Sequence, residues 1–383
     1  MEASLIKLRH FEILQPLCPV CRAAGQESPL KIGSVLREGN GSIREGILVC
    51  SNPGCLSEYP VLDGIPILLA NLRAYVSQNF LPVLCRDDLT EPMESLLGDC
   101  FGPGSAFDSW RQHLSTYVFD HYGDLDPGEG GQSPVPPGSI RRLFQRGCSL
   151  AERRAEGPVI DIGCAAGRTS FELAEQVDDI VLGMDLNFGM LKTAATILES
   201  GCVSYPRRRG GIVYERRRFP AAFERAEQVD FWVCDATALP FADRTFSAGI
   251  SLNVLDCVWS PYDFLAEMGR ILKPGGSAVL STPYDWNAGA TPVEAWLGGH
   301  SQRSGHRGSS PDVLRSLMSG GGHPNAVEGL ELLLEEEFPW TLRLHDRSFM
   351  EYLVSVMVIR KKMENGPEIH LDAQDSGPDS ESS

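Results

Sequence analysis

The sequence predicts an α/β protein whose C-terminal two thirds form a parallel sheet covered by helices, with a small β module ahead of it. Three observations support this prediction. From residue 139 to about residue 362, short apolar runs alternate with amphipathic segments, which is typical of strands joined by helices in a parallel sheet. The first apolar run ends in a glycine-rich turn, Gly163 to Gly167. Near the N-terminus, four cysteines occur as two close pairs.

Four regions can be separated along the 383 residues. Residues 1–70 form the cysteine-containing module. Residues 71–138 are expected to be a helical connector that ends in a Pro/Gly-rich linker. Residues 139–362 hold the α/β domain. Residues 363–383 are acidic and almost free of apolar side chains, so we expect a disordered tail there.

Within the α/β domain, each apolar or amphipathic run corresponds to one expected element. Helices are expected over 139–148, 169–176, 190–198 and 261–272. Strands are expected over 158–162, 180–184, 228–234, 247–252 and 277–281. A final hairpin of two strands is expected over 338–360. The last of the helices stops at the sequence Lys-Pro-Gly-Gly, because proline and glycine cannot continue a stable helix.

Charge and hydropathy exclude some classes of function. The formal net charge is −17 and the isoelectric point is near 4.9. This argues against a general binder of nucleic acid or of an anionic membrane, because both partners are polyanions. No run approaches the roughly 18 apolar residues of a membrane helix. Met1 to His10 carries charges and no apolar signal-peptide core. We therefore expect a cytoplasmic protein with a small-molecule partner.

A cofactor site is predicted by the glycine-rich turn and the aspartates around it. Such a turn between a strand and a helix lets the backbone approach a ligand and aims N–H groups at it. Asp185 ends the second strand, where an acidic residue can bind ribose hydroxyls. Asp235 ends the third, where it can accept a hydrogen bond from an adenine amino group. Asp161 suits the amino group of a methionine moiety better than a pyrophosphate. The simpler alternative is that all three are ordinary strand-end caps.

Together with the Lys-Pro-Gly-Gly segment before the fifth strand, these features resemble class I S-adenosylmethionine-dependent methyltransferases over roughly residues 140–362. The resemblance implies a Rossmann-like α/β fold with a seven-stranded sheet and S-adenosylmethionine as the cofactor. The cofactor-binding residues that it implies are Asp161, Gly163, Cys164, Ala165, Gly167, Asp185, Leu186, Asp235, Ala236 and Asn253. Ala165 stands where the family commonly has a second glycine.

Methyl transfer from a sulfonium needs positioning more than it needs an enzyme nucleophile. The acceptor lone pair must lie about 3 Å from the methyl carbon, and a base is needed only when the acceptor is a hydroxyl or a protonated amine. Candidates follow the fourth and fifth strands, at the carboxyl edge of the sheet. The expected catalytic residues are Asn253, Asp256, Tyr284 and Trp286, with Asp285 and Trp296 on the same loop. Core packing explains Trp296 equally well.

Three further segments resemble the methyltransferase domain of ovothiol biosynthesis, the mercaptohistidine N-methyltransferase. The first is Gly163 to Ala174, the second is His121-Tyr122-Gly123, and the third is the loop from Thr282 to Gly299, with its Thr-Pro-Tyr, Thr-Pro and Trp-Leu-Gly-Gly sequences. The resemblance spans about residues 115–362. It implies a small heteroaromatic acceptor, such as an imidazole nitrogen of a histidine derivative.

Two arginine triplets lie in an insert between Gly201 and Gln228, at residues 207–209 and 216–218. The simpler interpretation is a solvated charged surface. The alternative is an anionic substrate, because guanidinium groups bind carboxylates through two parallel hydrogen bonds.

The cysteine pairs predict a structural zinc site. Cys18 and Cys21 are separated by two residues, and Cys50 and Cys55 by four. Two tight turns can present four thiolates to tetrahedral zinc, and four thiolates leave no open position for catalysis. The text after the second pair, Glu58 to Pro66, resembles the small zinc-ribbon activator subunit of eukaryotic and archaeal methyltransferases. The alternative is four free cysteines.

Two other functions compete with a small-molecule methyltransferase. One is an RNA base methyltransferase, since bacterial ribosomal-RNA guanine methyltransferases also join an N-terminal zinc module to this fold. The negative net charge argues against it, and the arginine triplets argue mildly for it. The other is a non-catalytic protein that only binds the cofactor, and the intact glycine and aspartate positions disfavour it. The sequence gives no indication of the oligomeric state.

Overall fold

The computed structural model describes residues 8–39, 42–78, 101–129, 135–151, 156–318, 326–327 and 329–363, together with residues 91, 95 and 98. The predicted acidic tail, residues 363–383, lies outside the described residues after Met363. Much of the predicted connector also lies outside them, including residues 79–90 and 130–134. In the described part of the chain, no helix is both long enough and apolar enough to cross a membrane.

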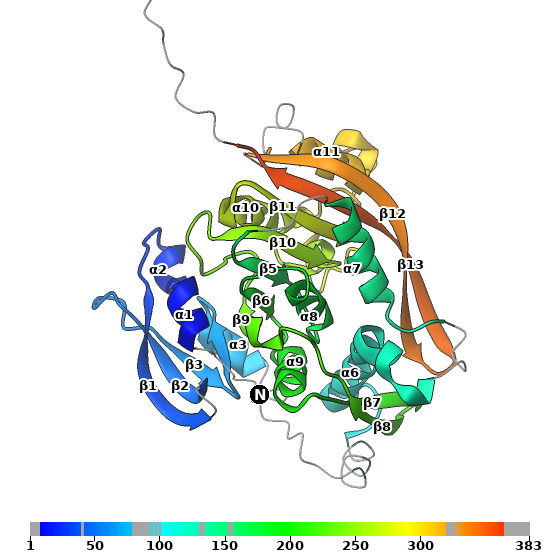
Figure 1. Cartoon of the computed structure of the whole chain (residues 1–383). Helices are drawn as coiled ribbons and strands as arrows, with labels where there is room; N and C mark the ends of the chain where they lie inside the picture. Colours follow the sequence, from blue (N-terminus) through cyan, green and yellow to red (C-terminus); the bar gives the residue numbers. More distant parts are fainter. Residues whose placement is uncertain are drawn as a thin grey trace, which may run out of the picture.

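The predicted Rossmann-like α/β architecture is confirmed. Seven strands of the C-terminal region pair in the order β9-β6-β5-β10-β11-β13-β12 (Figure 1). They are β5 (Val159–Ile162), β6 (Val181–Asp185), β9 (Val229–Cys234), β10 (Phe246–Leu252), β11 (Leu272–Thr282), β12 (Leu330–His345) and β13 (Ser348–Lys361). The first five in this order run parallel, and β13 is antiparallel to both β11 and β12. The carboxyl ends of the parallel strands therefore meet at one edge.

Helices cover both faces of this sheet because successive strand residues point to opposite sides. Val159 and Phe231 contribute to the apolar core on one face, whereas Ile160 and Trp232 contribute to the core on the other. The first face is covered by α6 (Ala106–Tyr122), α7 (Ser139–Leu150), α8 (Arg168–Ala174) and α9 (Phe188–Ser200). The second is covered by α10 (Pro261–Ile271), α11 (Ser310–Met318) and α1 (Leu8–Leu14), beside α2 (Pro19–Ala23).

The cysteine-containing module continues the central sheet, which the division at residue 70 did not predict. Its strands are β1 (Leu30–Gly39), β2 (Ser42–Cys50), β3 (Glu58–Leu62) and β4 (Ile65–Leu68), and they pair antiparallel in chain order. Strand β4 also pairs parallel with β9, with Ile67 opposite Val233. One eleven-stranded sheet results (Figure 1). All four residues of β4 are buried, as expected for a strand covered on both faces.

Polar contacts also join the module to the domain. The N–H of Leu17 donates to the carbonyl oxygen of Pro240 at 2.8 Å. Arg22 donates through Nε to the carbonyl oxygen of Leu239 at 2.7 Å and through Nη2 to Glu267 Oε1 at 2.6 Å. Glu267 in turn accepts the N–H of Leu239. The module and the domain are therefore held by buried strand pairing and by a shared carboxylate.

The insert after α9 forms a separate two-stranded hairpin of β7 (Cys202–Gly210) and β8 (Val213–Pro220). Its arginines are not simply solvated, because several pair with carboxylates of the same chain. Arg207 bonds to Glu129 and to Asp346, each at 3.0 Å, and Arg217 bonds to Asp126 at 2.6 Å. The triplets therefore anchor the hairpin to the domain, and the solvated interpretation is wrong for these two residues.

Other element boundaries differ modestly from the sequence expectations. Strand β11 begins at Leu272, directly after α10, because the Lys-Pro-Gly-Gly segment is already extended. The C-terminal hairpin begins at Leu330 rather than at residue 338. In the connector the structure describes α3 (Leu72–Gln78). The short 3-10 turns are η1 (Gly123–Leu125), η2 (Pro127–Glu129), η3 (Ala226–Gln228), η4 (Leu255–Cys257), η5 (Val293–Ala295) and η6 (Gly305–Gly308).

Candidate cofactor site and cysteine cluster

The glycine-rich turn between β5 and α8 adopts the backbone conformation that glycine favours. Gly163, Ala165 and Gly167 all have positive φ, at 77°, 45° and 85°. A Cβ atom on Gly163 would lie 2.2 Å from Cγ2 of Val254, and one on Gly167 would lie 2.6 Å from the ring of Phe231. Close packing therefore requires glycine at both positions, and the small side chain at Ala165 keeps the turn open to a ligand.

Strand β6 holds the turn in place and supplies the acidic residue beside it. The N–H groups of Gly163 and Cys164 donate to the carbonyl oxygen of Met184 at 2.7 and 3.0 Å. Asp185 Oδ2 accepts the N–H of Ala165 at 2.9 Å, and its Oδ1 accepts the N–H of Asn187 at 2.7 Å. Burial raises the pKa of Asp185. The carboxylate keeps further lone pairs for ribose hydroxyls, because each oxygen can accept two hydrogen bonds.

Two further predicted residues lie at the next strand of the same edge. Asp235 follows β9, and its Oδ1 accepts both the N–H and the hydroxyl of Thr237 at 2.8 and 2.7 Å. Among the described residues, Oδ2 of Asp235 has no hydrogen-bond donor. Ala236 is nearly buried beside it, while Leu186, after β6, is half exposed. This arrangement leaves one carboxylate oxygen available to an amino group.

Asn253, directly after β10, has a donor that a ligand could satisfy. Its backbone has a φ of 58°, and its Oδ1 accepts the hydroxyl of Ser281 at 2.8 Å. Its Nδ2 is buried, and no acceptor lies within reach among the described residues. A buried amide without a partner costs free energy. The donor set of this edge, with its carboxylates, its glycine turn and one orphaned amide, fits S-adenosylmethionine.

Asp161 has a supporting position under the turn rather than an exposed one. It is 2% exposed, and its Oδ2 accepts the hydroxyls of Thr169 and Ser170 at 2.6 and 2.7 Å. Burial raises its pKa to about 6, against these two hydrogen bonds. The carboxylate thereby fixes the start of α8. A direct contact with the methionine amino group stays a prediction.

The end of α6 covers the glycine turn from the other side. The hydroxyl of Tyr122 donates to the carbonyl oxygen of Ala166 at 2.7 Å. Nδ1 of His121 accepts the N–H of Arg168 at 3.2 Å. Burial and the charge of Arg168 lower the pKa of His121 to about 3, so the imidazole is neutral and can accept this bond. The His-Tyr-Gly sequence is therefore a structural support of the turn.

Tyr75 on α3 is a site residue that the sequence analysis missed. Its hydroxyl donates to the carbonyl oxygen of Leu186 at 2.5 Å and accepts the N–H of Phe188 at 3.2 Å. Since α3 follows β4, the connector thereby joins the cysteine-containing module to the loop after Asp185. An aromatic residue in a short helix gave no signal that could have identified this contact.

The predicted catalytic residues lie on and beside the loop after β11, and their contacts are mostly with other residues of the chain. Asp256 is 1% exposed, and its Oδ2 accepts the N–H of Asp285 at 2.8 Å. Trp286 donates to the hydroxyl of Ser310 at 2.9 Å and stacks on Trp296, with ring centroids 6.1 Å apart. These contacts shape the loop after β11. Burial raises the pKa of Tyr284, on the same loop, to about 12. Direct catalytic roles for Asn253, Asp256, Tyr284 and Trp286 stay predictions.

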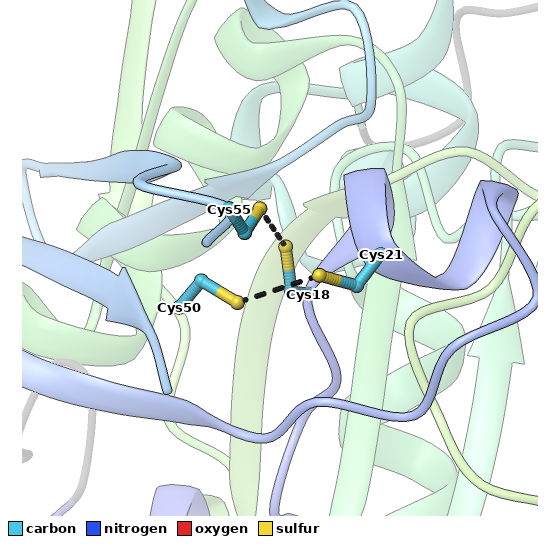
Figure 2. Close-up of side chains that lie close together, drawn as sticks. All are labelled: Cys18, Cys21, Cys50 and Cys55. Atoms are coloured by element: carbon cyan, nitrogen blue, oxygen red, sulfur yellow. Dashed lines mark hydrogen bonds between the residues drawn. The ribbon is translucent and has the colours of Figure 1, made fainter. Parts of the chain in front are cut away.

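The four N-terminal cysteines converge, as their spacing predicted. The Sγ atoms of Cys18, Cys21, Cys50 and Cys55 all lie within 4.8 Å of one another (Figure 2). The distance from Cys18 to Cys55 is 3.7 Å, and that from Cys21 to Cys50 is 3.6 Å. A disulfide needs about 2.05 Å, whereas thiolates about 2.3 Å from a tetrahedral metal lie about 3.8 Å apart. The cluster therefore has the dimensions of a metal site.

Polar groups around the sulfurs support this arrangement. The hydroxyl of Tyr59 lies 3.1 Å from Cys18 Sγ and accepts the N–H of Val20. The hydroxyl of Ser57 lies 3.0 Å from Cys55 Sγ, and the N–H of Asn52 donates to Cys50 Sγ at 3.4 Å. Hydrogen bonds to ligating groups orient them and tune a metal site.

Comparisons with known proteins agree with the fold. Residues 160–280 match the model of the methyltransferase domain family. The chain is 33% identical over 123 residues to a demethylmenaquinone methyltransferase of Renibacterium salmoninarum, covering 32% of this chain and 40% of that protein. It is 25% identical over 194 residues to the O-methyltransferase cnsE of Penicillium expansum, covering 51% of this chain and 60% of that protein. The chain thus spans about half the length of these curated relatives.

The chain is also similar to solved structures. A structure of a SAM-dependent methyltransferase from Methanosarcina mazei has 19% sequence identity and a TM-score of 0.37, covering 57% of this chain and 97% of that one. The family match to residues 160–280, which include the glycine turn, Asp185, Asp235 and Asn253, is the stronger finding. Residues 160–280 of the chain are therefore similar to a methyltransferase domain.

Replacing Tyr75 by phenylalanine tests the link between the module and the cofactor edge. The substitution leaves the carbonyl of Leu186 and the buried N–H of Phe188 without this partner, so the loop after β6 loses its support. We expect S-adenosylhomocysteine to bind about five-fold more weakly by isothermal titration calorimetry. Tyr262→Phe, on the exposed side of α10, is the matched control. Equal affinities for both variants would contradict the link.

The buried carboxyl of Asp161 predicts a pH dependence of stability. Its folded pKa of about 6 lies above the ordinary value of 3.8, so folding retains a proton between these pH values. Stability then falls as pH rises through this window. We expect Asp161→Asn to gain up to about 3 kcal/mol relative to the wild type between pH 4 and pH 7.

Urea unfolding of the cofactor-free protein at several pH values measures this difference. Asp263→Asn, at an exposed position of α10, is the control and should follow the wild type. A constant difference between Asp161→Asn and the wild type across the window would show that Asp161 does not titrate as described.

Proposed function

We propose that the whole chain is an S-adenosylmethionine-dependent methyltransferase that acts on a small molecule. The observation that carries this proposal is that Asp185, Asp235 and Asn253 lie at the carboxyl ends of β6, β9 and β10, at the same edge as the glycine turn after β5, and that Asp185 accepts the N–H of Ala165 in that turn. The names of relatives are consistent with it, since they specify a demethylmenaquinone methyltransferase and a norajmaline N-methyltransferase. The latter, from Rauvolfia serpentina, is 24% identical over 177 residues.

Each residue has a defined task in this proposal. When bound, S-adenosylmethionine supplies an electrophilic methyl group. Asp185 binds the ribose hydroxyls, and Asp235 accepts a hydrogen bond from the adenine amino group. Asn253 donates its orphaned Nδ2–H to the cofactor. The chain contributes orientation and exclusion of water rather than a nucleophile.

The proposed acceptor is a small nitrogen heterocycle, such as the imidazole of a histidine derivative. Support comes from the sequence segments that resemble the ovothiol-type methyltransferase. In the structure, Gly163 to Ala174 forms the glycine turn and the whole of α8, and the Trp286–Trp296 pair braces the loop after β11. The segments that carry the resemblance therefore lie around one edge of the sheet.

The contacts of four of the six triplet arginines weaken the competing RNA function. The arginine triplets were its main argument. Arg207 and Arg217 form internal ion pairs, Arg209 pairs with Glu215 and Asp346, and Arg208 bonds to Gln112. Guanidinium groups that neutralise the protein's own carboxylates do not provide a surface for phosphates.

We also propose that the cysteine cluster holds one structural zinc ion. Four thiolates, with sulfur separations close to a tetrahedral edge, complete the coordination that structural zinc requires. Because β4 and β9 share a sheet, the metal would stabilise the module and, through it, the domain.

Replacing Asp185 by alanine tests the cofactor assignment. The loss of charge-assisted hydrogen bonds should weaken S-adenosylmethionine binding by about 10- to 100-fold, measured by isothermal titration calorimetry. Asp263→Ala should bind like the wild type. If the wild type does not bind S-adenosylmethionine, or Asp185→Ala binds equally well, the proposal fails.

A methyl-transfer assay tests the acceptor. Labelled methyl groups should appear in thiol-histidine derivatives, whereas label found only in total RNA would refute the small-molecule assignment.

Metal removal tests the zinc proposal. We expect about one zinc ion per chain by elemental analysis. Cys50→Ser should lower the free energy of unfolding by at least about 3 kcal/mol, because metal binding contributes directly to folding. Cys202→Ser, on the β7 hairpin, is the matched control and should retain both metal and stability. Protein that contains no zinc, with Cys50→Ser as stable as the control, would contradict the proposal.

A further inference from the structure

Asp285 and Tyr352 lie together at the edge where the proposed methyl transfer takes place. Thr282, the last residue of β11, pairs with Ser355 of β13. Asp285 follows Thr282 by three residues, and Tyr352 precedes Ser355 by three. The hydroxyl of Tyr352 donates to Asp285 Oδ2 at 3.1 Å. The backbone N–H of Asp285 donates to Asp256. The exposed carboxylate of Asp285 is therefore fixed from two sides.

Aromatic rings form one side of this position. Tyr352 stacks on Trp340, with centroids 5.3 Å apart and an interplanar angle of 27°. Trp340 Nε1 donates to Asp120 Oδ2 at 2.9 Å, which ties the stack to α6. Tyr117 lies one turn before Asp120 on the same helix. Helix α6 therefore brings a second tyrosine toward the ring of Tyr352.

The charged groups that act on Cys257 are the carboxylates of Asp256, Asp285 and Asp185. Burial, and then the negative charges of Asp256, Asp285 and Asp185, raise the pKa of the Cys257 thiol on η4 to about 12. The pKa of Tyr117 is also raised, by burial and by smaller contributions from Cys257, Tyr352 and Asp185. The carboxylates of Asp185, Asp256 and Asp285 thus all act on Cys257, and the last two are joined by the N–H of Asp285.

A negative environment with aromatic faces selects the charge of a ligand. It favours a cation, through the carboxylate and through the ring quadrupoles, and it disfavours a carboxylate or a phosphate. Arg207 and Arg217, two of the arginines that could have bound an anion, pair with carboxylates of the same chain. The charge of this site thus favours a basic acceptor over the anionic substrate that the arginine triplets suggested.

We propose that Asp285, oriented by Tyr352, binds the basic nitrogen of the acceptor, so that the acceptor is an amine or imidazole that is cationic near neutral pH. This nitrogen loses its proton through the exposed carboxylate of Asp285 to solvent before its lone pair accepts the methyl group. The rings of Tyr117 and Tyr352 flank this nitrogen. The inference rests on the proposed methyltransferase function and adds its acceptor class. Asp285 is a specificity-determining residue, and Tyr352 is its positioning residue.

Binding of matched probes to the full chain tests this inference. The protein is saturated with S-adenosylhomocysteine and titrated with histamine, imidazole-4-acetate, phenethylamine and phenylacetate. The two amines should bind about ten-fold more tightly than the two carboxylates. Asp285→Asn should remove about ten-fold of the amine affinity, and Tyr352→Phe should remove less. Asp312→Asn, at a partly exposed position on α11, should behave like the wild type.

S-adenosylhomocysteine affinity separates the two proposals. It should change less than about two-fold in Asp285→Asn, because Asp285 lies beyond the cofactor residues. The inference is overturned if carboxylates bind as well as amines, if Asp285→Asn keeps its amine affinity, or if neither amine binds below about 10 mM. A wild-type protein that fails to bind S-adenosylhomocysteine would instead count against the methyltransferase function itself.

Discussion

The parallel pairing of β4 with β9 is the constraint on which the rest of the structure depends. It turns a small cysteine-containing module into the outer part of the central sheet, so the module does not have to bury its apolar strands alone. The same pairing sets the position of α3, and hence of Tyr75, against the loop after β6. The cysteine cluster is thereby connected to the loop after Asp185 through β4, α3 and the hydrogen bonds of Tyr75.

Sequence reasoning succeeded where a local pattern determines the structure. The positive-φ positions of the turn need glycine or a small residue, so Gly163 and Gly167 could be recognised from the text. Residues that end parallel strands must meet at one edge, which brought Asp185, Asp235 and Asn253 together. Two cysteine pairs on tight turns converge for a similar geometric reason.

It could not identify contacts that depend on tertiary packing. The pairing of β4 with β9 joins residues more than 160 positions apart, and nothing in either run specifies the other. The partners of Arg207 lie at Glu129 and Asp346, so a charged insert resembled a solvated surface. Asp285 was noted only as part of a loop, because its bond to Tyr352 requires the register between β11 and β13.

Buried carboxylates determine the electrostatics of the carboxyl edge. Burial raises the pKa values of Asp161, Asp185 and Asp256, so each of these carboxylates destabilises the folded protein at neutral pH relative to a solvated one. A fold that retains such groups at one edge must offset the cost elsewhere, and the eleven-stranded sheet supplies that stability. What the edge gains is a negative, partly desolvated environment, in which interactions with positive charge are stronger than in water. A sulfonium cofactor and a basic acceptor would each relieve part of the cost on binding, and a neutral thioether product would relieve less. The same carboxylates that weaken the folded state would therefore favour binding of the methyl donor over binding of the demethylated product.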